Sequence, residues 1–435
     1  MKKTLIIIAL LLFHFTKAQQ TTLQVVNKNL VTVSGQTITL RGINYPLIDD
    51  GNINPADAVS YQFYINEAAK TGANAIRLPW YTNGVHWRDV QTPGTLNGYN
   101  VNGHLNNIIA YCISKKMIPI LEIHDLTCSD DWSSFNTTVM NFWTSPSVLA
   151  LIENNKSHLI INLANEFDKV RWANNPTKAL TTFKNNYNTA IATLRNAGIK
   201  VPIMIDAPDC GQSSSELLSI AESMNATDSI HNLVFSAHAY WGGYAATLAQ
   251  IQTKLNEAQS KNVCFLLGEV AKNQDDGSCG NLNLASIYPQ ILTEAGSRNI
   301  GWLAWTYAQD CSVAREMTTN GTFGTLTSFG NDIVNNTIYG LKSTSGYGAT
   351  VLSNGKFSSE NLKIAVFPNP SKGQFTIETE AVLKKVQVYD VVGKEMKLIK
   401  KNSGNYEIYN PKVGIYFLKI ETENGYSIAK KINVQ

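Results

Sequence analysis

Short apolar runs alternate with longer amphipathic stretches through most of this 435-residue chain. Eight runs rich in Ile, Leu, Val and Ala predict strands at 40–44, 73–80, 118–124, 159–166, 201–209, 233–240, 263–270 and 300–307. The stretches between them place apolar residues at helical spacing, and several end in Gly. Strands that alternate with helices predict a parallel sheet.

Eight strand–helix units in about 300 residues fit a (β/α)8 TIM barrel of the α/β class. An open doubly wound sheet would usually have a Gly-rich phosphate turn after its first strand, and RGINYP at 41–46 is not such a turn. Residues 21–40 have the pattern of a β-hairpin. We expect this hairpin to precede the first barrel strand and to close the bottom of the barrel.

The pattern changes near residue 341. Residues 341–361 are rich in Ser, Gly, Thr and Asn without an apolar period, which is typical of a linker. Residues 362–435 alternate with the period of strands and predict a small all-β, sandwich-like module. A barrel domain at 19–340 would therefore precede the linker.

The first eighteen residues have the features of a secretory signal peptide. Lys2 and Lys3 precede an apolar stretch, and Ala18 offers a cleavage site. A membrane helix is the alternative, but the stretch is too short and no second span follows, so we expect no span in the mature protein. Removing residues 1–18 takes away three lysines and no acids, which lowers the formal charge from +3 to zero. This balance does not suggest nucleic acid as a partner.

The cysteine pattern leaves the disulfide pairing open. The chain has six cysteines, which are Cys112, Cys128, Cys210, Cys264, Cys279 and Cys311. Six allow fifteen connectivities, and no CxxC metal spacing is present. Cys279 and Cys311 fall in loops after two late strands, where a bridge could form, whereas Cys112 and Cys264 have the context of buried thiols.

No cofactor or metal is expected. Asp130-Asp131 and Asp275-Asp276 are acidic pairs that could hold a surface Ca²⁺. Solvated loop acids are the favoured interpretation of both pairs.

Polar side chains gather where the predicted strands end, which in a parallel barrel is the catalytic face. They are Arg77, His124, Asn165, Glu166, Asp206, Asp209, His238, Tyr240, Glu269 and Trp305. Glu166 ends the fourth strand and Glu269 the seventh. Two opposed Glu side chains suit glycosidic cleavage, in which one protonates the departing oxygen and the other attacks the anomeric carbon. Salt-bridged structural acids are the alternative.

Seven segments resemble glycoside hydrolase family 5 over about residues 38–340. RGIN, GANAIRLPW, LEIHD, INLANE, HAY, LGE and GWLAW occur here in the order of that family. The resemblance implies that Glu166 is the acid/base and Glu269 the nucleophile. It also implies that Asn165 binds the 2-hydroxyl of the sugar.

The same resemblance implies roles for five further residues. Arg77 and Tyr240 should lie beside Glu269 and keep it ionised and oriented. His124 and His238 should bind substrate hydroxyls or tune the carboxylates. Trp305 should be the platform under the reacting sugar.

Four other tryptophans lie in or near the predicted strands and helices of the barrel. Trp80 and Trp132 follow strand ends, so a sugar-stacking subsite and simple packing both stay open for them. Trp143 lies in a helical pattern and is expected to pack. Trp302 alternates with Trp305 along one strand and should therefore face the core.

LEIHDLTCSDDW and IINLANEF most resemble the bacterial β-mannanases of the family. Phe167 stands where Trp is usual, and Val270-Ala271 replaces Phe-Gly. We expect these three residues to lie in the walls of the cleft, where they would affect which substrate binds but not the hydrolysis itself. β-1,4-Mannan is favoured and β-1,4-glucan is the near alternative. A non-catalytic glycan-binding barrel at the cell surface is the rival class, although binding alone does not need two opposed acids.

Segments 366–378, 386–396 and 414–434 resemble the C-terminal sorting domain of the type IX secretion system. This implies contact with that machinery and a secreted, extracellular or outer-surface location. A carbohydrate-binding sandwich is the alternative, but the module contains no Trp. Tyr389 and Tyr416 fit strand positions that face a core. The module has twelve lysines and seven acids.

Overall fold

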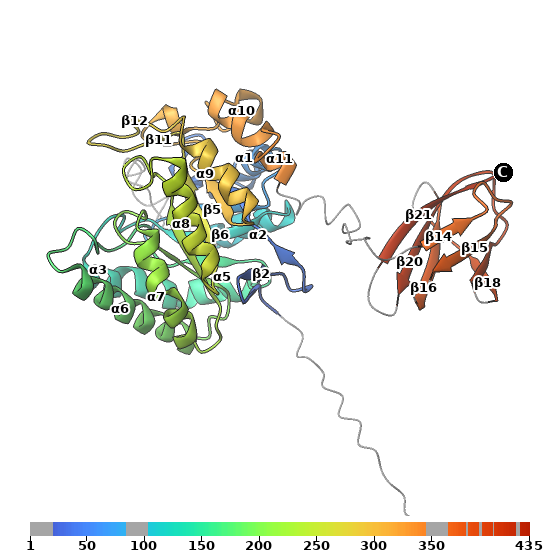
Figure 1. The fold of residues 1–435 in the computed structure, drawn as a ribbon, viewed down its shortest axis with the longest axis horizontal. Coiled ribbons are helices and arrows are strands. Elements are labelled where there is room, and N and C mark those ends of the chain that lie inside the picture. Colours follow the sequence, from blue (N-terminus) through green and yellow to red (C-terminus); the bar gives the residue numbers. More distant parts are fainter. Residues whose placement is uncertain are drawn as a thin grey trace, which may run out of the picture. The chain divides into compact units, whose positions relative to one another are not determined.

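The computed structural model describes residues 21–83, 103–344, 364–379, 382–390, 394–402, 404–422 and 427–435 (Figure 1). The chain divides into two compact units between residues 345 and 346. The predicted signal peptide lies outside the described residues, as does the predicted linker from residue 345 onward. Within the described ranges, no helix is long and apolar enough to cross a membrane.

Eight parallel strands form a closed barrel in the order β10-β13-β4-β5-β6-β7-β8-β9. They are β4 Arg41–Asn44, β5 Ala75–Trp80, β6 Ile118–Ile123, β7 Ile160–Asn162, β8 Ile203–Asp206, β9 Leu233–His238, β10 Cys264–Val270 and β13 Gly301–Ala304. Each strand lies within one of the eight predicted runs. The predicted (β/α)8 barrel is therefore confirmed.

Helices connect the barrel strands and cover the barrel from outside (Figure 1). The longer ones are α1 Ala58–Ala69, α2 His104–Ser114, α5 Pro146–Asn155, α6 Pro176–Asn196, α7 Ser214–Thr227, α8 Leu248–Ser260, α9 Tyr288–Ser297 and α10 Ser328–Asn335. Shorter pieces are η1 Leu47–Asp49, α3 Trp132–Ser134, η3 Phe135–Val139, α4 Met140–Thr144, η4 Val313–Arg315, η5 Phe323–Thr325 and α11 Leu341–Thr344. The Thr247 side chain and Gln250 form a capping box at the start of α8, as expected for a helix N-terminus.

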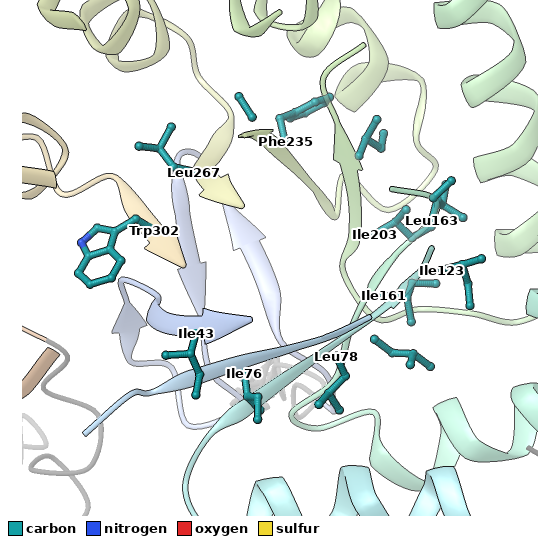
Figure 2. Packing of buried hydrophobic residues seen from close by; sticks show 14 of the residues in the cluster. Ile43, Ile76, Leu78, Ile123, Ile161, Leu163, Ile203, Phe235, Leu267 and Trp302 are labelled. Carbon is teal, nitrogen blue, oxygen red and sulfur yellow. The ribbon is translucent and has the colours of Figure 1, made fainter. Parts of the chain in front are cut away.

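The apolar core lies between the barrel strands and the helices. Figure 2 shows buried side chains, among them Ile43, Ile76, Phe235 and Trp302, that point away from the middle of the barrel. Because strand side chains alternate, the other set faces into the barrel, and much of it is polar. Trp302 and Trp143 are fully buried, as predicted. Trp80 is only 1% exposed and is therefore a core residue, which rules out a sugar-stacking role for it.

The predicted N-terminal hairpin is a three-stranded antiparallel sheet of β1 Gln24–Val26, β2 Asn29–Val31 and β3 Thr37–Ile38. The Val25 amide donates to Asn232 Oδ1 at 2.8 Å, and Asn232 Nδ2 donates to the Leu23 carbonyl at 3.1 Å. Asn232 directly precedes β9. The sheet therefore packs at the N-terminal ends of the barrel strands, the bottom of the barrel.

The predicted linker begins too early. Residues 341–344 form the helical turn α11, and Leu341 is fully buried in the barrel unit's core. Leu341 is followed by Lys, Ser, Thr, Ser and Gly, so the sequence shows no apolar period from this position onward. The barrel unit therefore extends at least to Thr344.

The second unit is an all-β module of two four-stranded sheets, β14-β15-β19-β18 and β17-β16-β20-β21. Its strands are β14 Ile364–Phe367, β15 Gln374–Thr379, β16 Leu383–Tyr389, β17 Glu395–Met396, β18 Leu398–Asn402, β19 Asn405–Ile408, β20 Gly414–Thr422 and β21 Ser427–Val434. Phe375, Tyr406, Tyr416 and Leu418 share its core. Tyr389 is only half-buried and pairs with Phe417, which is 44% exposed, so the core position expected for Tyr389 is wrong.

Candidate active site

A cavity of about 500 Å³ lies at the C-terminal ends of the barrel strands. Six of the eight predicted site residues line it, namely His124, Asn165, Glu166, Tyr240, Glu269 and Trp305. The other two, Arg77 and His238, are fully buried and contact the lining carboxylates. Strands far apart in the sequence therefore bring all eight side chains together.

Glu269, at the end of β10, is held by two donors. Arg77 Nη1 donates to its Oε1 at 2.8 Å, and the Tyr240 hydroxyl donates to its Oε2 at 2.5 Å. Each carboxylate oxygen thus accepts a hydrogen bond, and hydrogen bonds of this charge-assisted kind are among the stronger ones in proteins. The side chain is held in one orientation with its carboxylate at the cavity.

Glu166 follows β7 and has a different environment. His238 Nδ1 lies 2.7 Å from its Oε1, and its own amide donates to Asp206 Oδ2 at 3.4 Å. Its φ of 50° turns the chain out of the strand. Burial raises the pKa of the Glu166 carboxyl, His238 opposes the rise and the negative Glu269 adds to it.

The two carboxylates face the same space. One oxygen of Glu166, one oxygen of Glu269 and a ring nitrogen of His238 all lie within 4.8 Å of one another. His238 Nδ1 is also 3.5 Å from Glu269 Oε1, so the imidazole lies next to both acids.

Arg77, from the middle of β5, is the centre of a buried polar network. Its guanidinium donates to Asn162 Oδ1 at 2.9 Å, Asn44 Oδ1 at 3.0 Å and Asn165 Oδ1 at 2.6 Å, and reaches Asp206 at 3.3 Å and Glu122 at 3.6 Å. Burial lowers the Arg77 pKa, but the surrounding carboxylates outweigh it and raise the pKa above its ordinary value. Arg77 therefore stays charged and fixes the side chains around it.

The two histidines of the predicted site, His124 and His238, are each paired with a carboxylate. His124 Nδ1 lies 3.1 Å from Glu122 Oε2, and His238 Nε2 lies 3.6 Å from Asp206 Oδ2. Burial lowers both pKa values, but the neighbouring carboxylates raise that of His124 to about 9 and that of His238 to about 10. Both imidazoles are therefore positively charged near neutral pH.

Trp305, which directly follows β13, forms one wall of the cavity. Its Nε1 donates to Asp310 Oδ2 at 2.9 Å, and Arg315 holds Asp310 with contacts of 2.7 and 2.9 Å. The His124 ring is stacked with Trp305 at 5.9 Å between centroids and 10° between planes. The indole plane is thus fixed from two directions.

Two disulfides lie at the cavity. Cys279–Cys311 is the bridge whose loops were identified from the sequence, and Cys112 and Cys264 are free and buried, as predicted. Cys128–Cys210 was not predicted. It joins the loops after β6 and β8, a pairing that the spacing of the cysteines could not distinguish.

The other expected walls and subsites are placed differently. Trp132 packs against Phe135, Phe167 and Tyr187, with centroids 4.8–5.5 Å apart, and is not among the cavity-lining residues. Phe167 is fully buried in this aromatic group. Val270 and Ala271 are also fully buried, so the expectation that these three departures line the cleft is wrong.

Several functional candidates were missed. Asn44 and Asn162 contact Arg77, but Asn44 ends the first predicted run and Asn162 lies inside the fourth, and neither amide was selected from the sequence. Trp172 lines the cavity and is 54% exposed. It could have been found from the sequence, because it is an aromatic residue in the polar stretch after the fourth predicted strand. Arg315 had no signal in the sequence, because it reaches the cavity from the short helix η4, which carries no motif.

The acidic loop pairs have protein partners. Asp131 caps α3 by accepting from Ser133 and Ser134, and Asp130 lies 3.3 Å from Lys169 Nζ. Asp275 accepts from Arg315 at 2.8 Å. These contacts favour the interpretation of both pairs as loop acids.

Comparison with known proteins agrees with this geometry. The family model described as cellulase (glycosyl hydrolase family 5) matches residues 31–310. The chain belongs to glycoside hydrolase family 5. A second model, the secretion system C-terminal sorting domain, matches residues 365–435, so this family 5 enzyme is secreted or held at the cell surface.

The curated relatives of this family 5 chain include two bacterial mannan endo-1,4-beta-mannosidases. The protein from Cellvibrio japonicus (strain Ueda107) is 27% identical over 354 residues, which cover 79% of this chain and 72% of the relative. The protein from Streptomyces lividans is 25% identical over 323 residues, which cover 72% of this chain and 73% of the relative.

Solved structures show the same fold. The catalytic domain of a mannanase from Streptomyces sp. SirexAA-E superposes with a TM-score of 0.60 at 22% identity, covering 79% of this chain and 97% of that one. A cellulase, Cel5C_n, superposes with a TM-score of 0.54 at 17% identity, covering 72% and 91%. The predicted family, barrel and sorting domain are confirmed, and the chain is a glycoside hydrolase.

Proposed function

We propose that the chain is a secreted, endo-acting, retaining β-1,4-mannanase with Glu166 as acid/base and Glu269 as nucleophile. The observation that carries the proposal is the pair of buried carboxylates at one cavity, with oxygens within 4.8 Å of each other. Retaining glycosidases place their two carboxyl groups about 5–5.5 Å apart, whereas inverting enzymes leave room for a water at about 6.5–9.5 Å. The close spacing supports retention.

In the first step, a Glu269 oxygen attacks the anomeric carbon and forms a covalent ester with the sugar. The bond to the glycosidic oxygen breaks, and Glu166 gives its proton to that oxygen. The raised pKa of Glu166 favours the protonated acid that this step requires. Arg77 and Tyr240 hold the attacking carboxylate in position.

In the second step, a water molecule attacks the same carbon. Glu166, now a carboxylate, takes a proton from the water, and the Glu269–sugar bond breaks. Two inversions at one carbon give a product with the original configuration. Glu166 is again protonated, so the cycle closes.

The remaining predicted residues would bind the reacting sugar. Asn165 lines the cavity and is held there by Arg77 and by a contact of 3.0 Å from its Nδ2 to Thr127 Oγ1, and it would bind the 2-hydroxyl of the sugar. Trp305 would stack under the ring, and His124 would donate to a hydroxyl. His238 would tune Glu166.

The relatives support mannan as the polymer, because two curated proteins that each match more than 70% of this chain are named mannan endo-1,4-beta-mannosidases. An endo-β-1,4-glucanase is the second candidate, favoured by the likeness to a solved cellulase, which has a lower TM-score than the mannanases. A non-catalytic glycan-binding protein is a weaker third candidate, because both acids are present with their supporting donors.

We also propose a route of export. Residues 1–18 would be removed as a signal peptide, and the module at 362–435 would engage the type IX secretion machinery. The match of the sorting-domain model to residues 365–435 supports this route.

The test is incubation of the purified protein with mannan, glucomannan and carboxymethylcellulose, with new reducing ends counted. We expect the highest rate on mannan and no release by Glu269→Ala, which should still bind the polymer. Preference for carboxymethylcellulose would support the glucanase instead. No release from any of the three would overturn the enzyme proposal.

A further inference from the structure

Trp172 is an exposed aromatic side chain at the rim of the cavity. It is 54% exposed, it follows Glu166 by six residues, and it lines the same cavity as both carboxylates. A single exposed apolar residue is ordinary on a protein surface and needs no function. What distinguishes Trp172 is the way in which the surrounding loops hold it there.

The backbone just before Trp172 is fixed by a buried acid. Asp209, which is fully buried, accepts from the Val170 amide at 2.8 Å and from the Arg171 amide at 3.1 Å. The Asp209 amide in turn donates to the Asp168 carbonyl at 2.8 Å. The loop after β7 is thus tied to the loop after β8.

Arg171 occupies the space beside the indole. Its Nε donates to Ser213 Oγ at 2.6 Å and lies 3.3 Å from Asp209 Oδ2. Its guanidinium carbon lies 4.6 Å from the Tyr244 ring centroid and 5.8 Å from the Trp172 centroid. Arg171 is therefore held by other groups and lies beside the indole.

A third loop completes the rim. The Cys128–Cys210 disulfide ties the loop after β6 to the loop after β8, and the Asp168 amide donates to the Ser129 carbonyl at 2.7 Å. Both half-cystines line the cavity, and Cys128 Sγ lies 3.3 Å from Glu166 Oε2. The loops after β6, β7 and β8 are therefore linked to one another beside Glu166.

The position of this rim relative to the two carboxylates decides what it would bind. Cys128, Trp172 and Gln212 come from the loops after β6, β7 and β8, respectively, and these three strands are adjacent in the barrel. Trp305 instead follows β13, which lies next to β10, the strand that carries Glu269. In the proposed mechanism the reacting sugar lies against Glu269 and Trp305. The departing sugar lies next to Glu166, because Glu166 protonates its oxygen.

We propose that Trp172 is the stacking platform of a leaving-group subsite, which binds a hexose ring of the β-glycan chain beyond the bond that is cut. This inference rests on the proposed retaining mechanism. Aromatic rings recognise sugars through their flat apolar faces, and a loop backbone that is already held in place reduces the entropy lost on binding. The amide of Gln212 supplies a polar partner at the same rim.

The subsite has a consequence after the first chemical step. A sugar that binds there can attack the glycosyl–enzyme in place of water. Its hydroxyl oxygen then bonds to the anomeric carbon, the bond to Glu269 breaks, and Glu166 takes the hydroxyl proton. Trp172 should therefore raise transfer to sugar acceptors relative to hydrolysis.

The experiment compares two substrates in the full-length protein, β-mannohexaose and β-mannobiosyl fluoride. Fluoride leaves without occupying a sugar subsite, so loss of Trp172 should affect the hexaose more strongly. In Trp172→Ala we expect the ratio of the two kcat/KM values, hexaose over fluoride, to fall about three- to tenfold, as loss of one stacking contact predicts. Transfer to added mannobiose, relative to hydrolysis of the fluoride, should fall by a similar factor.

Two variants serve as controls. Trp172→Phe keeps a flat ring and should recover part of both ratios. Phe63→Ala removes an aromatic side chain that is 49% exposed on α1 and is not among the cavity-lining residues, so it should leave both ratios unchanged.

If the wild type hydrolyses the fluoride but Trp172→Ala changes neither ratio, the subsite is wrong while the proposed function stands. If the wild type does not hydrolyse either substrate or the corresponding gluco-oligosaccharides, both the subsite and the proposed function are overturned.

Discussion

Glu166 and Glu269 are the same residue type at one cavity, yet the protein surrounds them differently. Glu269 accepts from Arg77 and Tyr240, whereas Glu166 is paired with His238 and lies in a buried setting that raises its pKa. Different surroundings are how one kind of side chain supplies both a nucleophile and an acid.

This difference predicts the effect of His238 on the pH profile. The proposed acid must be protonated, so kcat/KM should fall as pH rises through the pKa of Glu166. The His238 cation lowers that pKa. In His238→Asn the pKa of Glu166 should rise, and the alkaline limb of kcat/KM should move to higher pH. His231→Asn, a change of an exposed histidine with left-handed φ that suits Asn, should leave the limb in place. A limb that stays or moves to lower pH in His238→Asn would contradict this account.

At the residue scale, the sequence was sufficient for side chains that end strands. Glu166, His238 and Glu269 could be selected because parallel strands present their C-terminal ends at one face, whereas Arg77, which was expected there too, lies in the middle of β5. Asn44 and Asn162 also end strands, β4 and β7, but they could not be selected, because nothing near them in the sequence indicates their contacts with Arg77, which lies 33 and 85 residues away.

At the scale of elements, apolar runs located every barrel strand but overestimated some lengths. The fourth run was expected at 159–166, whereas β7 ends at Asn162. Beyond Asn162 the Leu163 amide still donates to the Met204 carbonyl at 3.1 Å and the Asn165 amide to the Ile123 carbonyl at 2.9 Å, and Glu166 then adopts a left-handed φ. The departure from regular structure thus occurs where the chemistry is placed.

The disulfides make a prediction at the same scale. Cys128–Cys210 and Cys279–Cys311 close segments with separations of 82 and 32 residues. Loss of loop-closure restraint should lower the free energy of unfolding by about 2–4 kcal/mol for each bridge. The double variants Cys128→Ser/Cys210→Ser and Cys279→Ser/Cys311→Ser would be compared with the wild type by denaturant unfolding. Equal stability of all three proteins would show that the bridges do not constrain the fold.

At the scale of the whole molecule, the cavity-lining residues lie between positions 124 and 315, within the barrel unit. The boundary between the units was predicted too early, because polar residues follow Leu341 and its burial depends on tertiary packing. The sorting module was identified because its alternating strands and motifs are local in the sequence.

This boundary predicts how two truncations differ. A chain that ends at Thr344 should keep the kcat/KM of the full-length protein. A chain that ends at Gly340 lacks buried Leu341, so its free energy of unfolding should be lower by about 2–3 kcal/mol. Activity assays and denaturant unfolding of both chains check this. Equal stability of the two would mean that Leu341 does not belong to the barrel core.

The retaining mechanism is the central claim, and the configuration of the first product tests it most directly. Proton NMR during hydrolysis of a β-1,4-manno-oligosaccharide would resolve the anomeric signals before mutarotation. Two carboxylates with oxygens within 4.8 Å predict that the β-anomer appears first. If the α-anomer appears first, Glu269 does not act as a covalent nucleophile and the account is wrong.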